Sequence, residues 1–338
     1  MRVAIVSDPL IEFGGEQRVL EVLHEMFPEA PVFTGLLRLD RLPERYKSWD
    51  IRPSGSLIAR LVNLLPFRSL KLLLIPVYQN LNFSGYDLVI SSGTFFAKCA
   101  GSGIEHKSAD RKRWKHITYI HTPPRFLYGY ETSSGMRSKP ILKLLLSPLD
   151  HVLRLWDFRS AQKPDLLLCN SEEVASRIRK FYRKEAVIVY PPVVIGEKKQ
   201  KKLNKISKRE DYFLVVSRLE KYKNVDLAVR ACNIAKIPLV VVGDGGELKY
   251  LTEIAGPTVN FLGKVGDDEL VRLYLQAKAF IFPVKNEDFG ITPIESQSFG
   301  CPVIAHRSGG AMETVIDGKT GLFFDRLEAH LLAEILRE

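Results

Sequence analysis

Short runs of apolar, mostly β-branched residues alternate with helix-like patterns along the chain, and this alternation restricts the fold more than any other feature. Each run is apolar at consecutive positions, which is typical of strands buried on both faces of a parallel sheet. The runs are residues 3–6, 88–90, 117–120, 166–168, 187–189, 213–216, 239–242, 279–282 and 302–304. Strands that alternate with helices predict an α/β doubly wound fold.

The length of 338 residues predicts two domains. Pro191 and Pro192 are followed by a lysine-rich polar stretch, residues 197–211, and a new strand pattern starts at Tyr212. A run of lysines can be a binding patch, but it is more often a solvated segment, and we interpret this one as a linker. The predicted organisation is an N-terminal domain over 1–190, a linker over 191–211 and a C-terminal domain over 212–338.

The composition, 46% hydrophobic and 26% charged, is that of a globular protein. We see no signal peptide and no apolar run that could span a bilayer. Four scattered cysteines, without metal-ligand spacing, favour a reduced, cytoplasmic protein. The net charge of +10 favours anionic partners such as nucleotide phosphates or lipid head groups. Nucleic acid is not expected, because no nucleic-acid-binding motif is recognisable.

Two glycines, Gly14 and Gly15, lie between the first strand and a helical pattern with Val19, Leu20 and Leu23 on one face. A strand, a glycine loop and a helix can direct backbone N–H groups at an anion. The alternative is a tight turn without a ligand. The pattern is not the dinucleotide fingerprint, which argues against a nicotinamide enzyme.

A second loop follows the strand at 279–282. Thr292, Pro293 and Glu295 have the spacing of an N-cap, a first helical residue and a third, so a capping box predicts a helix that begins at Thr292. The amides of residues 289–292 would then face the crevice at the carboxyl end of the sheet, where ligands of such folds bind. Glu295 is open to two interpretations, a helix cap or a ligand contact.

Arg218 and Lys223 follow the first strand of the second domain, five residues apart. Together they could reach one pyrophosphate, with arginine as a planar fork and lysine as a point charge. Either one alone could be a solvated surface cation.

Together these segments resemble the retaining GT-B glycosyltransferases of the glycogen-synthase-like kind, the family 4 type. That pattern has two glutamates separated by seven residues, here Glu287 and Glu295 with Phe289-Gly290 between them. The matching segments, in order, are 217–223, 242–245, 261–265, 287–295 and 308–310. Residues 121–128, 153–161, 169–171, 190–193 and 287–293 further resemble the O-antigen-type mannosyltransferases.

The resemblance implies two Rossmann-like domains that face a central cleft, with the acceptor on the N-terminal side. It implies transfer of a sugar, with GDP-mannose as the expected donor, to a lipid-linked glycan. Neither a metal nor a cofactor is expected.

The resemblance also assigns roles to residues. Glu287, His121, Arg218 and Lys223 would be catalytic. Donor contacts would come from Gly14, Gly15, Arg218, Lys223, Lys264, Val265, Glu287, Phe289, Gly290, Ile291, Thr292 and Glu295. Glu295 would hold the ribose and Glu287 the transferred sugar, while Arg125 and Tyr128 would lie on the acceptor side.

The sequence departs from the family pattern in two places. Glu16 and Gln17 stand where Ala-Glu often follows the two glycines, and the chain ends at Glu338, where relatives usually continue, so a truncated C-terminus is expected.

Three apolar stretches with interspersed cations, 57–65, 68–74 and 141–146, are either core helices or helices that lie on an anionic membrane. The second interpretation would place the protein at the inner face of the cell membrane.

Two other functions share parts of this pattern. A non-hydrolysing sugar-nucleotide epimerase has the same architecture, but it is not expected to combine Arg218 and Lys223 with the paired glutamates. An inactive sugar-nucleotide-binding scaffold is the other alternative. Turnover assays with several nucleotide sugars separate the three.

Overall fold

The computed structural model describes residues 1–64, 72–103, 114–132, 140–193 and 209–337. The chain divides into two compact units, each described by itself below. Unit 1 comprises Met1–Tyr130 and Gly135–Pro192, and unit 2 comprises Glu131–Ser134 and Val193–Glu338. Most of the predicted linker, residues 194–208, lies outside the described residues.

Unit 1 is built on a seven-stranded sheet with the order β3-β2-β1-β4-β5-β6-β7, in which the recorded pairings are parallel. Its strands are β1 (Val3–Ser7), β2 (Val32–Thr34), β3 (Ile51–Pro53), β4 (Leu88–Gly93), β5 (Lys115–Ile120), β6 (Leu166–Cys169) and β7 (Val187–Ile188). Its helices are α1 (Gly15–Met26), α2 (Leu57–Leu64), α3 (Ile75–Gln79), α4 (Pro140–Ala161) and α5 (Glu172–Tyr182), with short 3₁₀ turns η1 (Leu39–Arg41), η2 (Glu44–Ser48) and η4 (Ala97–Cys99).

Unit 2 repeats this arrangement with six parallel strands in the order β10-β9-β8-β11-β12-β13. The strands are β8 (Phe213–Val216), β9 (Leu239–Val242), β10 (Val259–Gly263), β11 (Ala279–Phe282), β12 (Val303–His306) and β13 (Gly321–Phe324). The helices are η6 (Lys221–Lys223), α7 (Val225–Ala235), α8 (Leu248–Ile254), α9 (Asp267–Gln276), α10 (Ile291–Ser298), α11 (Ala311–Thr314) and α12 (Ala329–Arg337).

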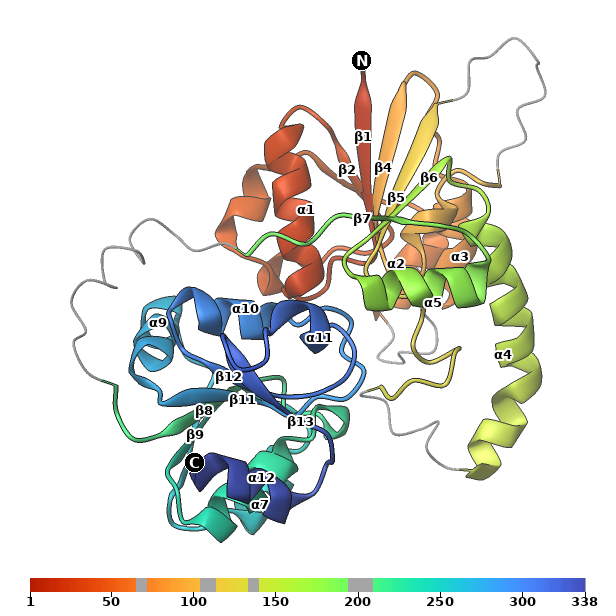
Figure 1. Cartoon of the computed structure of the whole chain (residues 1–338). Coiled ribbons are helices and arrows are strands. Elements are labelled where there is room, and N and C mark those ends of the chain that lie inside the picture. The colour runs from red at the N-terminus through yellow and green to blue at the C-terminus, as the bar shows by residue number, and fades with distance from the viewer. Residues whose placement is uncertain (65–71, 104–113, 133–139, 194–208, 338) are drawn as a thin grey trace. The chain divides into compact units, whose positions relative to one another are not determined.

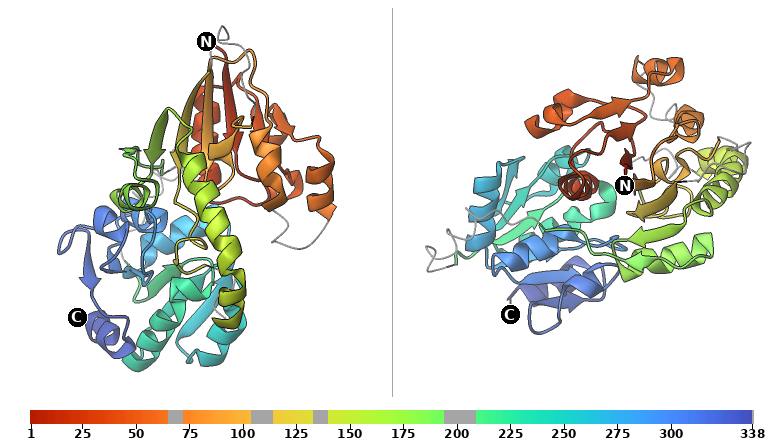
Figure 2. Two further views of the ribbon diagram at one scale, coloured as in Figure 1. Left: turned by 90° about the vertical axis from the view of Figure 1, so that its right-hand side faces the viewer. Right: turned by 90° about the horizontal axis from the view of Figure 1, so that it is seen from above.

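Successive side chains of one strand pack into two separate cores, one on each face of the sheet, which explains why the strands are apolar throughout. In β8, Phe213 and Val215 pack with α7 and α12, whereas Leu214 packs on the other face with α9 and α11. Figure 1 shows these helices on opposite sides of the sheet, and the views in Figure 2 show the same layering. Side chains alternate between the faces of a strand, so a sheet covered on both sides needs apolar residues at every position. The predicted α/β doubly wound class is confirmed.

Each sheet has one point at which the chain order reverses. In unit 1 this point lies between β1 and β4, and in unit 2 between β8 and β11. Loops that leave the two strands on either side of such a point diverge in opposite directions and open a crevice at the carboxyl edge of the sheet. The loops predicted to carry chemistry in unit 2 follow β8 and β11, so they leave the sheet on either side of this point.

Candidate active site

Lys223 and Glu287 are the two predicted site residues that unit 2 brings into direct contact. Lys223 Nζ donates to Glu287 Oε1 at 2.9 Å and to Oε2 at 2.7 Å, although the residues are 64 positions apart. Their side chains are only 11% and 20% exposed. A carboxylate bonded through both oxygens is fixed in orientation, and the shielding from water strengthens the pair. The sequence assigned these residues separate roles, but in the fold they form one ionic unit.

Arg218, the other predicted cation, is exposed on the loop after β8. Its Nη2 donates to the Tyr222 hydroxyl at 2.9 Å, so the 3₁₀ turn η6 holds the guanidinium. The turn also carries Lys223, which explains how both cations come from one short loop.

The loop that contains Glu287 is held by two glycines from the segment after β12. Gly310 donates its backbone N–H to the Glu287 carbonyl at 2.9 Å. A Cβ at Gly309 would lie 2.5 Å from that same carbonyl oxygen, and Gly309 has a φ of +59°. A side chain there would therefore strain the backbone and displace the Glu287 loop. The matched segment 308–310 has a steric reason for its glycines.

The predicted capping box at Thr292 is wrong. Helix α10 begins at Ile291, its N-cap is Gly290 with a φ of +90°, and no side chain caps the helix. The left-handed glycine turns the chain straight into the helix, so Thr292 and Pro293 lie inside the first turn. Glu295 Oε2 instead accepts from the Tyr274 hydroxyl at 3.4 Å. A helix cap therefore does not account for Glu295.

Lys264 and Val265 follow β10, at the same edge of the sheet. In the matched segment 261–265, β10 extends to Gly263, and only then does the chain turn. The loops of adjacent strands are tightly joined here, since Gly243 N donates to the Gly263 carbonyl at 2.8 Å and a Cβ at Gly243 would overlap the Ser217 carbonyl. Lys264 is exposed and Val265 is half-buried.

In unit 1, Gly14 and Gly15 mark the start of α1 as predicted: the helix begins at Gly15 with Gly14 as its N-cap. Gly14 has an extended φ of −164° that any residue could adopt. A Cβ there would meet Gln17 Oε1 at an ordinary 3.6 Å. Packing among the described residues therefore does not require glycine at position 14.

Asp8, which sequence reasoning missed, occupies the reversal point of the unit 1 sheet. Its carboxylate accepts four backbone N–H groups, those of Thr94, Phe95, Phe96 and Ala97, at 2.7 to 2.9 Å. Four such bonds fix the loop after β4 to the end of β1. The sequence does show an aspartate directly after the first strand. It could not show the role of this residue, because its partners are backbone N–H groups that every residue type except proline has.

Glu16 lies close to Asp8. Burial, and then the charge of Asp8, raise the pKa of Glu16 well above its usual range. The departure from the family pattern at this position thus places a second acidic side chain at the same edge of the sheet.

His121 follows β5 at this edge. Its Nε2 lies 2.9 Å from Ser92 Oγ, and its backbone N–H donates to the Gly93 carbonyl at 3.2 Å. Burial lowers the pKa of His121 to about 3, so the ring is neutral near pH 7. It can act as a neutral hydrogen-bonding group but not as a fixed cation.

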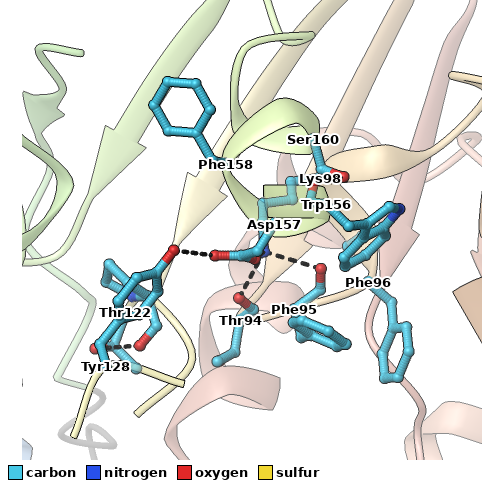
Figure 3. Close-up of polar contacts among 12 residues, drawn as sticks. Thr94, Phe95, Phe96, Lys98, Thr122, Tyr128, Trp156, Asp157, Phe158 and Ser160 are labelled. Atoms are coloured by element: carbon cyan, nitrogen blue, oxygen red, sulfur yellow. Dashed lines mark hydrogen bonds and ion pairs between the residues drawn. The ribbon is translucent and has the colours of Figure 1, made fainter. Parts of the chain in front are cut away.

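The two predicted acceptor-side residues have internal partners. The Tyr128 hydroxyl donates to Asp157 Oδ2 at 2.9 Å, and Arg125 lies over the Tyr130 ring at 5.7 Å. Asp157 also forms a buried ion pair with Lys98, with Nζ and Oδ1 2.7 Å apart. Figure 3 shows Asp157 between Lys98 and Tyr128, so α4 is joined to the loop that follows β5.

Among the residues that the structure describes, no group of three or more His, Cys, Asp or Glu could hold a metal ion, and the four cysteines are buried and unpaired with one another.

Residues 196–338 match the family model of glycosyl transferases group 1. A GDP-mannose-dependent α-mannosyltransferase of Corynebacterium glutamicum is 36% identical over 32% of this chain and 26% of its own length. The α-1,3/1,6-mannosyltransferase ALG2 of Rhizomucor pusillus is 27% identical over 62% of this chain and 54% of its own length. The chain thus spans between about a quarter and a half of these two relatives.

Anabaena HepE, solved in complex with UDP and glucose, has a similar fold. The TM-score is 0.67, with 19% identity over 98% of this chain and 88% of that one. The two parallel sheets and this structural likeness support a GT-B fold, and residues 196–338 match the glycosyl transferases group 1.

Proposed function

We propose that the chain is a retaining glycosyltransferase that transfers mannose from GDP-mannose to a lipid-linked glycan. The observation that carries the proposal is the contact between Lys223 and Glu287 at the reversal point of the unit 2 sheet. Arg218 lies on the same loop as Lys223, and α10 begins shortly after Glu287. This point lies within the segment that matches the glycosyl transferases group 1.

The chemistry of these groups suits a nucleoside diphosphate leaving group. An ammonium has three donors, and two bonds to Glu287 leave the third for a phosphate oxygen. The Arg218 guanidinium adds a planar fork, and the first amides of α10 add a positive helix end. Such groups stabilise the negative charge that grows on the β-phosphate as the glycosidic bond breaks.

The carboxylates would hold the donor's hydroxyls. Lys223 fixes the orientation of Glu287, whose remaining lone pairs can accept from hydroxyls of the transferred sugar. Glu295, from the first turns of α10, would accept from the ribose, and Lys264 and Val265 would lie against the base. From unit 1, Gly14 and Gly15 would approach the pyrophosphate.

His121 would position donor and acceptor as a neutral ring. We propose substitution on the front face of the sugar, in which the leaving phosphate takes the proton of the acceptor hydroxyl. The reaction would then need neither a carboxylate nucleophile nor a metal or cofactor. Arg125 and Tyr128 would border the acceptor rather than touch the reacting atoms.

GDP-mannose is the proposed donor because two relatives are mannosyltransferases, one of them GDP-mannose-dependent. HepE was solved with UDP, so the base is the point to test. Calorimetric titration with GDP-, UDP- and ADP-sugars should give the tightest binding for GDP-mannose, followed by transfer with retained anomeric configuration in the product. Tighter binding of a UDP- or ADP-sugar would overturn the choice of donor, and conversion of the sugar nucleotide without any acceptor would indicate an epimerase.

A further inference from the structure

Helix α4 carries a row of large apolar side chains that face solvent. Their exposed fractions lie between 44% and 76%. The row consists of Ile141, Leu144, Leu145, Leu149, Val152 and Leu155. Apart from the adjacent Leu144 and Leu145, successive members are three or four residues apart, which places these side chains along one face of the helix. Isolated exposed leucines are common, but a continuous row of six marks an interaction surface.

The second half of α4 packs against unit 1 with its opposite face. Leu153, Asp157 and Ser160 are buried there, and Trp156 packs against the same core. In this half of the helix, the exposed Val152 and Leu155 are therefore not part of the core face, because Leu153, Asp157 and Ser160 already form it. The first turns of α4 extend beyond the sheet of unit 1 (Figure 1).

The segment that contains α4 also carries the whole charge excess of the chain. Residues 51–161 hold 16 lysines and arginines against six aspartates and glutamates, a net +10, which equals the net charge of the complete sequence. The remaining residues carry 33 of each sign. An apolar row within a strongly basic segment is the combination that anionic lipid surfaces attract.

We propose that the exposed face of α4 docks into the surface of an anionic lipid bilayer, with the helix lying in the membrane plane. The proposal extends the proposed function, since a lipid-linked acceptor is presented at such a surface. No helix in the described part of the chain is long and apolar enough to cross a membrane. In α4 itself, Lys143, Asp150, Arg154 and Asp157 interrupt the apolar sequence, which suits a helix that lies on the bilayer.

The contacts of Asp157 connect this surface with the acceptor side of unit 1. Asp157 faces the core, where it accepts from Tyr128 in the loop that follows His121 (Figure 3). A helix with its side chains is about 10–12 Å across. Docking through the outer face would therefore bring the Tyr128 loop to within about one helix diameter of the membrane surface, which suits an acceptor that stays in the lipid.

Vesicle binding by the whole chain, without donor or acceptor, tests the proposal separately from the transferase assignment. We expect binding to phosphatidylcholine vesicles that contain phosphatidylglycerol, little binding to phosphatidylcholine alone, and weakening at high salt. The variant Leu144→Glu/Leu145→Glu should bind at least about tenfold more weakly. The matched control is Met26→Glu/Ile316→Glu, which adds the same charge at positions 63% and 55% exposed and should bind like wild type.

A second variant tests the same contact by a signal that appears rather than disappears, so the test does not depend on the folding of Leu144→Glu/Leu145→Glu. Leu145→Trp adds one indole at the proposed contact, and brominated lipid should quench its emission when anionic vesicles are added. Equal binding by the two glutamate variants, or no added quenching in Leu145→Trp, would refute the docking. So would a dimer in solution that Leu144→Glu/Leu145→Glu dissociates while vesicle binding is unchanged, because the face would then serve a second copy of the chain.

Discussion

Replacing Lys223 with methionine removes the ammonium that pairs with Glu287 while keeping most of the side-chain volume. Glu287 would then lose two hydrogen bonds of 2.7 and 2.9 Å in a place that is largely shielded from water. Breaking a buried pair costs about 3–5 kcal/mol and an exposed pair about 0–1 kcal/mol. With side chains 11% and 20% exposed, this pair lies nearer the buried limit, and we expect a loss of about 2–3 kcal/mol.

Differential scanning calorimetry of the whole chain measures this loss. For a unit of this size, about 1 kcal/mol lowers the melting temperature by about 2–4 °C, so the transition of unit 2 should fall by roughly 4–12 °C. The matched control is Lys221→Met, which removes an exposed lysine from the same short turn and should change stability by less than about 0.5 kcal/mol.

A double-mutant cycle with Glu287→Gln separates the pair from the individual side chains. The variant Lys223→Met/Glu287→Gln leaves no unpaired charge and should melt closer to wild type than either single variant does. Lys223→Met should also weaken donor binding by about tenfold or more, because charge-assisted bonds contribute about 1.5–3 kcal/mol. Single changes that simply add, with no coupling energy, would refute the view that Lys223 and Glu287 act as one unit.

Four further outcomes are expected. Glu295→Gln should weaken donor binding about tenfold in calorimetric titration with little change in melting temperature, and an unchanged dissociation constant would argue against a ribose contact. Gly309→Ala should lower both stability and donor affinity, because the new Cβ would lie too close to the Glu287 carbonyl oxygen and the backbone has a positive φ at this position. Wild-type values for both quantities would contradict the packing described above. Burial lowers the pKa of His121 to about 3, so wild type should lose stability as the pH falls from about 6.5 toward 3, where the unfolded chain binds a proton that the folded chain does not. The stability difference between wild type and His121→Asn, measured by urea unfolding, should therefore be smaller at pH 5 than at pH 7.5. If both proteins lose the same stability between these pH values, His121 is not the source of the acid sensitivity. Transfer should continue in excess chelator, and loss of activity that magnesium or manganese restores would show that a metal is needed.

The sequence predicted the nine strands with the longest apolar runs, and each of them forms at the predicted place. It did not predict β2 and β3, which have three residues each, or β13 and β10. Three of them contain residues that are rare in strands: Pro53 in β3, Asn260 and Gly263 in β10, and Gly321 in β13. They form because neighbouring strands supply their hydrogen bonds.

The residues of the unit 2 site could be named from motifs, but their contacts could not. Lys223 and Glu287 meet only because β8 and β11 are neighbours, and strand order is not visible in a local pattern. The N-terminus of α10 was placed incorrectly because Thr292 and Pro293 have good capping spacing, while the left-handed turn at Gly290 takes precedence. Local propensity is overridden here by the path that the chain must take.

The two sheets have the same strand order around their reversal points, yet one of these points is already filled. In unit 1 the carboxylate of Asp8 sits where a bound anion would sit and uses the four amides that surround it. It behaves as a built-in ligand, so these amides are not available to a phosphate from solution. Despite the duplicated architecture, a titration with nucleotide should therefore saturate at one molecule per chain, and phosphate should not compete at a second site in unit 1.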